Sequence, residues 1–234
     1  MNGVTPSIAT LEQQGFALLP RFASPESTEE LRDAAAEISF TSKRAGIRDL
    51  LRASSRVAAF ASSLEVIEQL AAFTHARPFA VRGILFDKTP EANWLVAWHQ
   101  DLTIAVRERR EAEGFDPWSV KDGTPHVQPP ADLLARMLTM RLHLDDCDAG
   151  NGALRVLPGS HAHGKLSATQ ITEWRTRTPE HVCQARAGDA LLMRPLLLHA
   201  SSPASTPRHR RVIHLEFAVD ELPDGLAWAE RISG

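Results

Sequence analysis

The sequence predicts a mainly β fold, a sandwich or barrel, with helices flanking it. Six runs between Phe79 and residue 222 are rich in β-branched residues or alternate between apolar and polar ones. Glycine, proline, asparagine and aspartate separate these runs, which is typical of all-β sandwiches and barrels. The first 78 residues instead carry alanine and leucine at helical spacing. We expect one domain over residues 1–234, with helical support from 1–78 and the barrel from 79–222.

The helical part opens with a short apolar segment. Residues 15–20, GFALLP, predict a buried strand, and Ser24 can cap a helix that would run to about Ile38. Residues 47–75 carry alanine, leucine and valine at helical spacing, with breaks at two serine pairs. This pattern predicts two or three short helices.

The β part contains six predicted strands, in the segments VRGILFDK, WLVAWHQDL, MLTMRLHLDD, GALRVLP, DALLMRPLLLH and RVIHLEFAV. Two longer connections, residues 108–131 and 161–180, interrupt them. Because long ordered loops in compact domains are commonly functional, we expect both to border the site.

The composition argues against several classes of partner. The apolar share of 43% and charged share of 24% are ordinary for a soluble globular protein. A net charge of −3, with only a small basic cluster at residues 208–211, makes nucleic acid and anionic membrane unexpected partners. Cys147 and Cys183 lie in no metal-binding spacing, and no signal peptide or membrane-length apolar run is present. These features favour a cytoplasmic protein and indicate nothing about oligomeric state.

The first candidate metal ligands lie in Trp98-His99-Gln100-Asp101, at the end of a predicted strand. His99 and Asp101 are two residues apart, so their side chains share one face and can reach one metal. A single HxD is weak evidence in a chain with ten histidines. The alternative is a pair of surface polar residues at a strand end.

His199 ends the apolar run that starts at Ala190. It can be interpreted as a histidine buried in the core or as a third metal ligand. Arg210 favours the interpretation of His199 as a metal ligand. Arg210 starts the next predicted strand, and antiparallel pairing of that strand would bring it alongside His199. Two imidazoles and a carboxylate occupy one face of octahedral iron(II), which leaves the other face open for a bidentate 2-oxo acid and oxygen. The distal carboxylate of 2-oxoglutarate then needs a buried arginine, which offers paired, charge-assisted hydrogen bonds. Ser201 could donate another hydrogen bond to this carboxylate.

Three polar residues, Thr139, Arg141 and His143, alternate along one predicted strand and share a face. Inside a barrel, Arg141 would need a partner and could contact the co-substrate or an anionic substrate. Outside it, the three would form a solvent-facing ladder, and both alternatives remain open.

Other polar residues carry weaker arguments. Lys88 precedes the HxD strand, where a solvated lysine is favoured over one that reaches the pocket. Trp118 and His126 lie in the connection 108–131 and could line a substrate entrance or only pack the loop. No role is assigned to four further histidines, His163, His181, His209 and His214.

At these positions the sequence resembles the phytanoyl-CoA dioxygenase family of iron(II)/2-oxoglutarate oxygenases, which also includes bacterial ectoine hydroxylases. The matching motifs are WHQD, then NGALRVLPGSH at residues 151–161, then Gly188-Asp189, then His199 with Ser201 and Arg210. The resemblance covers most of the chain, because LEQQGFALLP and the helix after it also resemble the family's opening.

The resemblance implies a double-stranded β-helix, the jelly-roll barrel of the cupin type, with helices outside. It implies that His99, Asp101 and His199 bind iron(II) and that Arg210 and Ser201 bind 2-oxoglutarate, whereas the histidine of PGSH is not a ligand. The implied reaction uses O2 to hydroxylate an unactivated C–H bond of a small molecule, releasing succinate and CO2. Related halogenases carry a small residue where Asp101 stands, which favours hydroxylation over halogenation.

Alternative functions remain. A non-catalytic or differently metallated cupin-type binding protein would keep the barrel, but the full triad together with Arg210 speaks against it. A zinc hydrolase could use two histidines and an aspartate, but it would have no use for that arginine. Desaturation, cyclisation and epimerisation are compatible with the same site, and the substrate is not indicated.

Overall fold

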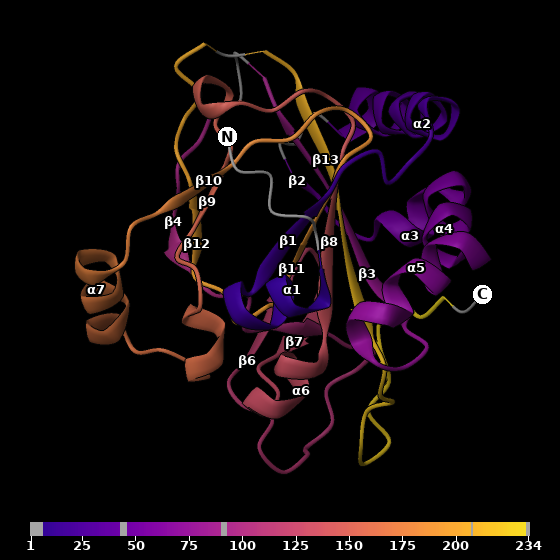
Figure 1. Ribbon diagram of the computed structural model, residues 1–234. Helices are drawn as coiled ribbons and strands as arrows, with labels where there is room; N and C mark the ends of the chain where they lie inside the picture. The colour runs from indigo at the N-terminus through magenta and orange to yellow at the C-terminus, as the bar shows by residue number, and fades with distance from the viewer. Residues whose placement is uncertain (1–6, 43–45, 90–92, 207, 233–234) are drawn as a thin grey trace.

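The computed structural model of the protein describes residues 7–42, 46–89, 93–206 and 208–232. Two antiparallel sheets face each other, and helices cover the outer face of the larger one (Figure 1). In order, the larger sheet contains β1 (Phe16–Leu19), β11 (Ala190–Met193), β8 (Leu138–His143), β13 (Arg210–Ala218), β3 (Phe79–Lys88) and β2 (Gly46–Ile47). The smaller sheet contains β10 (His181–Cys183), β9 (Leu154–Val156), β12 (His199–Ser201) and β4 (Val96–His99). The prediction of a mainly β fold with flanking helices is confirmed.

Most helices belong to the first third of the chain, as predicted. They are α1 (Ile8–Gln14), α2 (Pro25–Ser42), α3 (Leu50–Ala53), α4 (Ser55–Ser62) and α5 (Leu64–Thr74). The predicted cap is present, because the Ser24 hydroxyl accepts a hydrogen bond from the Ser27 amide. The serine pairs are helix boundaries: Ser54 and Ser63 accept hydrogen bonds from the amides of Val57 and Val66. Helix α1 and the short strand β2 were not predicted.

Strand β8 of the larger sheet has one apolar face and one polar face. On β8, Leu138, Met140 and Leu142 belong to the core cluster shared with α2–α5. The side chains of Thr139, Arg141 and His143 alternate with them and are also buried. A solvent-facing ladder is therefore wrong, and these polar residues face the space between the two sheets.

The apolar run from Ala190 to His199 is not one strand. Its first part, β11, lies in the larger sheet, and its last residue begins β12 in the smaller sheet. Between them the chain turns at Arg194 and Pro195, where the Leu197 amide donates to the Arg194 carbonyl. The predicted pairing of the Arg210 strand with that of His199 is wrong, because β13 pairs with β3 and β8. The turn at Pro195 moves His199 to the opposite sheet.

The two long connections have structure of their own. Residues 108–131 contain β6 (Trp118–Lys121) and β7 (Thr124–Val127), which form a third small sheet with β5 (Ile104–Ala105). A helix, α6 (Ala131–Arg136), follows this sheet, and residues 161–180 contain α7 (Ala168–Arg177). In the described part of the chain no single helix is long and apolar enough to cross a membrane, although the bent pair α4 and α5 passes that test by length and composition alone.

Candidate metal centre

The three predicted metal ligands come together on two neighbouring strands of the smaller sheet. His99 ends β4, His199 begins β12, and the two residues are partners in the antiparallel register. Asp101 follows β4 and is held by a hydrogen bond of 2.9 Å from its amide to the Pro195 carbonyl. The side chain of Gln100, between the two ligands, points away, and its Nε2 donates to the Leu196 carbonyl at 2.6 Å. The alternation predicted from HxD is thus present in the structure.

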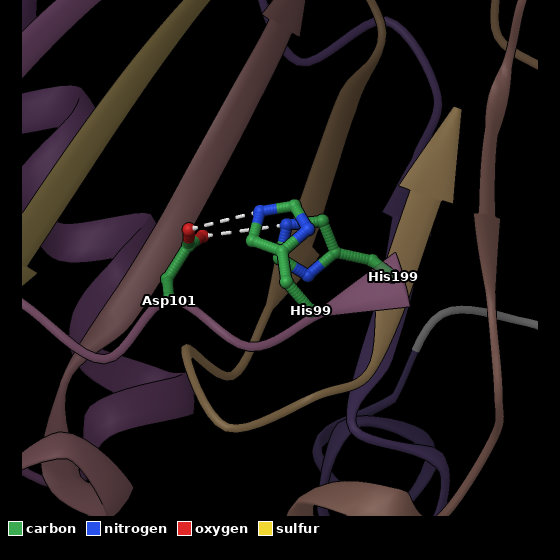
Figure 2. A group of neighbouring side chains, drawn as sticks. All are labelled: His99, Asp101 and His199. Atoms are coloured by element: carbon green, nitrogen blue, oxygen red, sulfur yellow. Dashed lines mark ion pairs between the residues drawn. The ribbon is translucent and has the colours of Figure 1, made fainter. Parts of the chain in front are cut away.

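The side chains of the triad surround one shared space. Figure 2 shows the Asp101 carboxylate directed at both imidazoles, with 3.7 Å from Oδ1 to His99 Nε2 and 3.6 Å from Oδ2 to His199 Nε2. All three ligand atoms lie within 4.8 Å of one another. These separations exceed hydrogen-bond length, so the atoms converge on a point without bonding directly. The arrangement suits a single ion.

Backbone carbonyls fix the orientation of both imidazoles. His99 Nδ1 donates to the Ala97 carbonyl at 2.8 Å, and His199 Nδ1 donates to the Leu197 carbonyl at 2.9 Å. The proton therefore sits on Nδ1 in each ring, and the Nε2 lone pair faces Asp101. Hydrogen bonds of this kind are the usual support for metal-binding histidines.

The protonation states of the triad also suit a metal. Burial alone would raise the pKa of Asp101, but His199, His214, His99 and Arg82 outweigh it and hold that pKa at about 2. Burial lowers the pKa of His199 to about 4. At neutral pH the site therefore offers an ionised carboxylate and a neutral imidazole. Asp101 Oδ2 is buried and has no hydrogen-bond partner among the described residues, as a metal ligand would.

The triad opens into a cavity of about 460 Å³ that lies between the two sheets. This volume is in the usual range for small-molecule sites. Its lining includes the three predicted co-substrate residues, Arg141, Ser201 and Arg210. Arg210 begins β13 and donates to the Gly152 carbonyl, while its Nε is buried and unpaired within the described chain. Arg210 thus shares a cavity with His199 because their sheets face each other.

Lys88 is not solvated, which corrects the prediction. Its side chain is 1% exposed, and Nζ donates to the Ser202 carbonyl at 2.7 Å and to Ser201 Oγ at 3.3 Å. Burial and the adjacent charge of Arg210 lower the pKa of Lys88 to about 8. Lys88 is the register partner of Arg210 on β3, and it contacts the lining residue Ser201, so two cations lie side by side next to the cavity.

A chain of polar contacts that was not predicted runs along the cavity floor. Arg141 donates to His214 Nδ1 at 3.1 Å, and His214 Nε2 lies 3.5 Å from Glu216 Oε1. Glu216 also accepts a hydrogen bond of 2.9 Å from Arg82. The sequence did indicate that these residues lie together. His214 and Glu216 are an even number of residues from Arg210 on one strand, so their side chains share a face with it.

Of the two long connections, residues 108–131 and 161–180, only the first contributes described residues to the cavity lining. Trp118 and His126 are absent from the cavity lining that the structure describes, and the lining instead includes Lys121 and Gln128 of the same connection. His126 is 1% exposed, and burial lowers its pKa to about 4. The described part of residues 161–180 does not line the cavity either, but its Gly164 carbonyl accepts a hydrogen bond from Gln100.

Solved structures with this fold share little sequence with the chain. The 2-oxoglutarate-dependent carbocyclase SnoK from nogalamycin biosynthesis is 14% identical with a TM-score of 0.74, covering 100% of this chain and 94% of its own. EctD from S. alaskensis with 2-oxoglutarate and 5-hydroxyectoine is 17% identical with a TM-score of 0.71, covering 94% of this chain and 78% of its own. The epimerase SnoN, solved with Fe3+, 2-oxoglutarate and nogalamycin RO, is 15% identical with a TM-score of 0.67, covering 97% of this chain and 93% of its own. This likeness confirms the predicted jelly-roll fold of the cupin type.

SnoN was solved with Fe3+ and 2-oxoglutarate and EctD with 2-oxoglutarate, which are the cofactors predicted from the sequence. No sequence among the curated proteins matches the chain significantly. The family model for phytanoyl-CoA dioxygenase (PhyH) matches residues 11–212, which include the whole triad and Arg210. The chain therefore belongs to the phytanoyl-CoA dioxygenase family.

Proposed function

We propose that the protein is an iron(II)- and 2-oxoglutarate-dependent dioxygenase that hydroxylates a C–H bond of a small organic molecule. The observation that carries the proposal is the joint position of the His99, Asp101 and His199 triad and the buried Arg210 in one cavity. A metal site alone would also suit a binding protein. Arg210, which forms no ion pair within the described residues, supplies the second requirement, a partner for the distal carboxylate of a 2-oxo acid.

The residues of the chain have separate tasks in this proposal. His99, His199 and Asp101 would hold iron(II) on one face, which leaves the opposite face for the keto and carboxylate oxygens of 2-oxoglutarate. Arg210 would pair with the distal carboxylate, assisted by Ser201 and by the charge of Lys88. When bound, the iron supplies the oxidative chemistry with O2, and the chain contributes binding, orientation and exclusion of water.

The position of Asp101 supports hydroxylation within this class. The Asp101 carboxylate would be one of the metal ligands, so it would fill the coordination site that a halide would need. Arg141 and Arg210 remain available for anionic groups, because the carboxylates among the described lining residues are Asp101 and Glu216 and neither forms an ion pair with them. Glu216 is already paired with Arg82.

The test is anaerobic addition of iron(II) and 2-oxoglutarate to metal-free protein, recorded as the weak visible charge-transfer band of the bidentate chelate. The expected result is a band in the wild type, no band in His199→Ala, and a band in Arg210→Ala only at much higher 2-oxoglutarate concentration. Arg175→Ala, which removes an exposed arginine on α7, is the matched control and keeps the wild-type band.

A folded protein that binds iron but gives no band would remove 2-oxoglutarate from the proposal. The remaining function would then be a metal-binding cupin of another kind. A band followed by succinate release in air would justify a substrate screen.

A further inference from the structure

The cavity has a second group of cations at the end away from Arg210. Arg82 and Glu216 are register partners on β3 and β13, six residues along β13 from Arg210. At about 3.3 Å per residue this separates the backbone positions of Arg210 and Glu216 by roughly 20 Å. Arg48 and Lys121 line the cavity together with Arg82.

Two of these three cations already have a carboxylate partner. Arg82 is paired with Glu216 at 2.9 Å, and Arg48 is paired with Asp122 at 2.6 Å. Lys121 is different: its Nζ donates to the Thr103 hydroxyl at 2.8 Å, and it forms no ion pair within the described residues. Arg48 Nε is also buried without a hydrogen-bond partner in the described part of the chain.

The electrostatics of this end of the cavity favour the binding of an anion. Burial, and then the like charges of Arg82 and Arg48, lower the pKa of Lys121. Neither carboxylate of the cavity lining is free to neutralise it, because Asp101 belongs to the metal triad and Glu216 to Arg82. A cation held among like charges in a cavity is stabilised when an anion binds there.

Apolar side chains also line the cavity. Those in the lining are Ile84, Phe86, Trp94, Val96, Leu102 and Leu154. The Thr103 hydroxyl that contacts Lys121 is two residues beyond Asp101, so this cationic end adjoins the metal triad. A molecule bound at Lys121 would therefore place its apolar part close to the metal.

We propose that Lys121 and Arg48 form an oxyanion subsite, and that the substrate is a small molecule with a carboxylate or phosphate attached to an apolar body. The substrate class rests on the proposed function, since the same cavity holds the metal triad. The co-substrate does not use this subsite, because its distal carboxylate pairs with Arg210 at the other end. Lys121 is thus a specificity-determining residue for the reaction.

The experiment titrates protein loaded anaerobically with iron(II) and saturating 2-oxoglutarate. The probes are hexanoate, hexyl phosphate and uncharged hexan-1-ol, followed by calorimetry, with the charge-transfer band recorded in parallel. We expect hexanoate or hexyl phosphate to bind about tenfold or more tightly than hexan-1-ol, as charge-assisted hydrogen bonds allow. The stronger of the two probes distinguishes a carboxylate substrate from a phosphorylated one.

Three variants assign the effect to the side chain. Lys121→Met should weaken the preferred oxyanion probe about tenfold or more and leave hexan-1-ol unchanged. Lys121→Arg keeps the charge and should restore binding. Lys165→Met removes a lysine outside the cavity lining and should behave as the wild type.

Equal affinity of the preferred probe for wild type and Lys121→Met would overturn the subsite, as would no measurable binding of either oxyanion. Loss of the band during titration would place the probe at the Arg210 end and would also overturn it. Failure of the proposed function is a separate result, an absent band before any probe is added. Calorimetry without 2-oxoglutarate still measures whether oxyanion binding depends on Lys121.

Discussion

His99 and His199 face each other across two antiparallel strands, and their ring centroids are 4.2 Å apart. The register of β4 and β12 therefore sets the spacing of two of the three candidate ligands. A shift of one residue in either strand would turn its histidine to the opposite face of the sheet. The hydrogen bond from the Asp101 amide to Pro195 ties the third ligand to the same pair of strands.

Metal binding should stabilise the fold through this arrangement. Iron(II) added anaerobically at about 100 times its Kd should raise the free energy of unfolding by about 2.7 kcal/mol, seen as a higher Tm. Asp101→Ala should lose most of this increase, because the remaining pair of imidazoles lacks the anionic ligand. Asp33→Ala, an exposed aspartate on α2, should keep it. An equal rise in Tm for both variants would place the ion elsewhere.

Lys88 should favour co-substrate binding at a cost in stability. Its pKa of about 8 means that the ammonium group is mostly charged at pH 7 and neutral at pH 9. In the wild type, 2-oxoglutarate affinity should therefore fall as pH rises from 7 to 9. Lys88→Met should bind 2-oxoglutarate more weakly at pH 7 and show a flat profile over that range.

The effect of Lys88 on folding has the opposite sign. Its folded pKa lies below the unfolded value, so between about pH 8 and 10.5 the unfolded state holds more protons and stability rises with pH. Lys88→Met should thus unfold at higher denaturant concentration than the wild type at pH 7 without 2-oxoglutarate. Parallel affinity profiles for the two proteins would show that the ammonium charge does not reach the co-substrate.

The sequence could indicate that His99, Asp101 and His199 lie close together because its evidence is local. HxD at a strand end and a histidine closing an apolar run do not require knowledge of which strands pair. The predicted route from His199 to Arg210 was wrong for a reason visible in the sequence, since Arg194-Pro195 interrupts the run and marks a turn. Apolar content alone cannot distinguish one long strand from two short ones in different sheets.

Lys88 and His214 show what a sequence cannot supply by itself. Both side chains lie on the same face of the paired strands β3 and β13 as Arg210. This can be deduced only when the two strands are known to pair and in which register. Without the pairing, a lysine near a strand end is more simply explained as solvated. The helices outside the larger sheet pack on its second face, where Leu85, Ile213 and Leu215 belong to the shared core cluster.

His143 should make stability depend on pH. Its side chain is 2% exposed, and burial, followed by the charges of Arg141 and Arg210, lowers its pKa to about 3. Between pH 6.5 and about 3 the unfolded state binds a proton that the folded state does not, so stability falls as pH is lowered, by about 1.4 kcal/mol per unit.

Replacing this histidine should remove that dependence. His143→Leu also eliminates two buried ring nitrogens that have no hydrogen-bond partner among the described residues. Chemical denaturation at pH 7, 6 and 5 should show a smaller loss of stability in the variant than in the wild type. Identical slopes would mean that His143 is protonated in the folded protein. The matched control is His75→Leu, because His75 is exposed.

Gly152 should be required for both backbone geometry and co-substrate binding. Its φ is +67°, and an added Cβ would lie 2.9 Å from the Ser202 carbonyl oxygen and 3.2 Å from Lys88 Nζ. Gly152→Ala should cost about 1–3 kcal/mol through the left-handed conformation alone. It should also weaken 2-oxoglutarate binding, because the Gly152 carbonyl accepts a hydrogen bond from Arg210.

Gly123→Ala separates the effect on stability from the effect on binding. The φ of Gly123 is +82°, but no described atom lies within 4 Å of an added Cβ, so this variant should lose stability and keep wild-type affinity. Equal affinity in both variants would show that the backbone at Gly152 does not position Arg210.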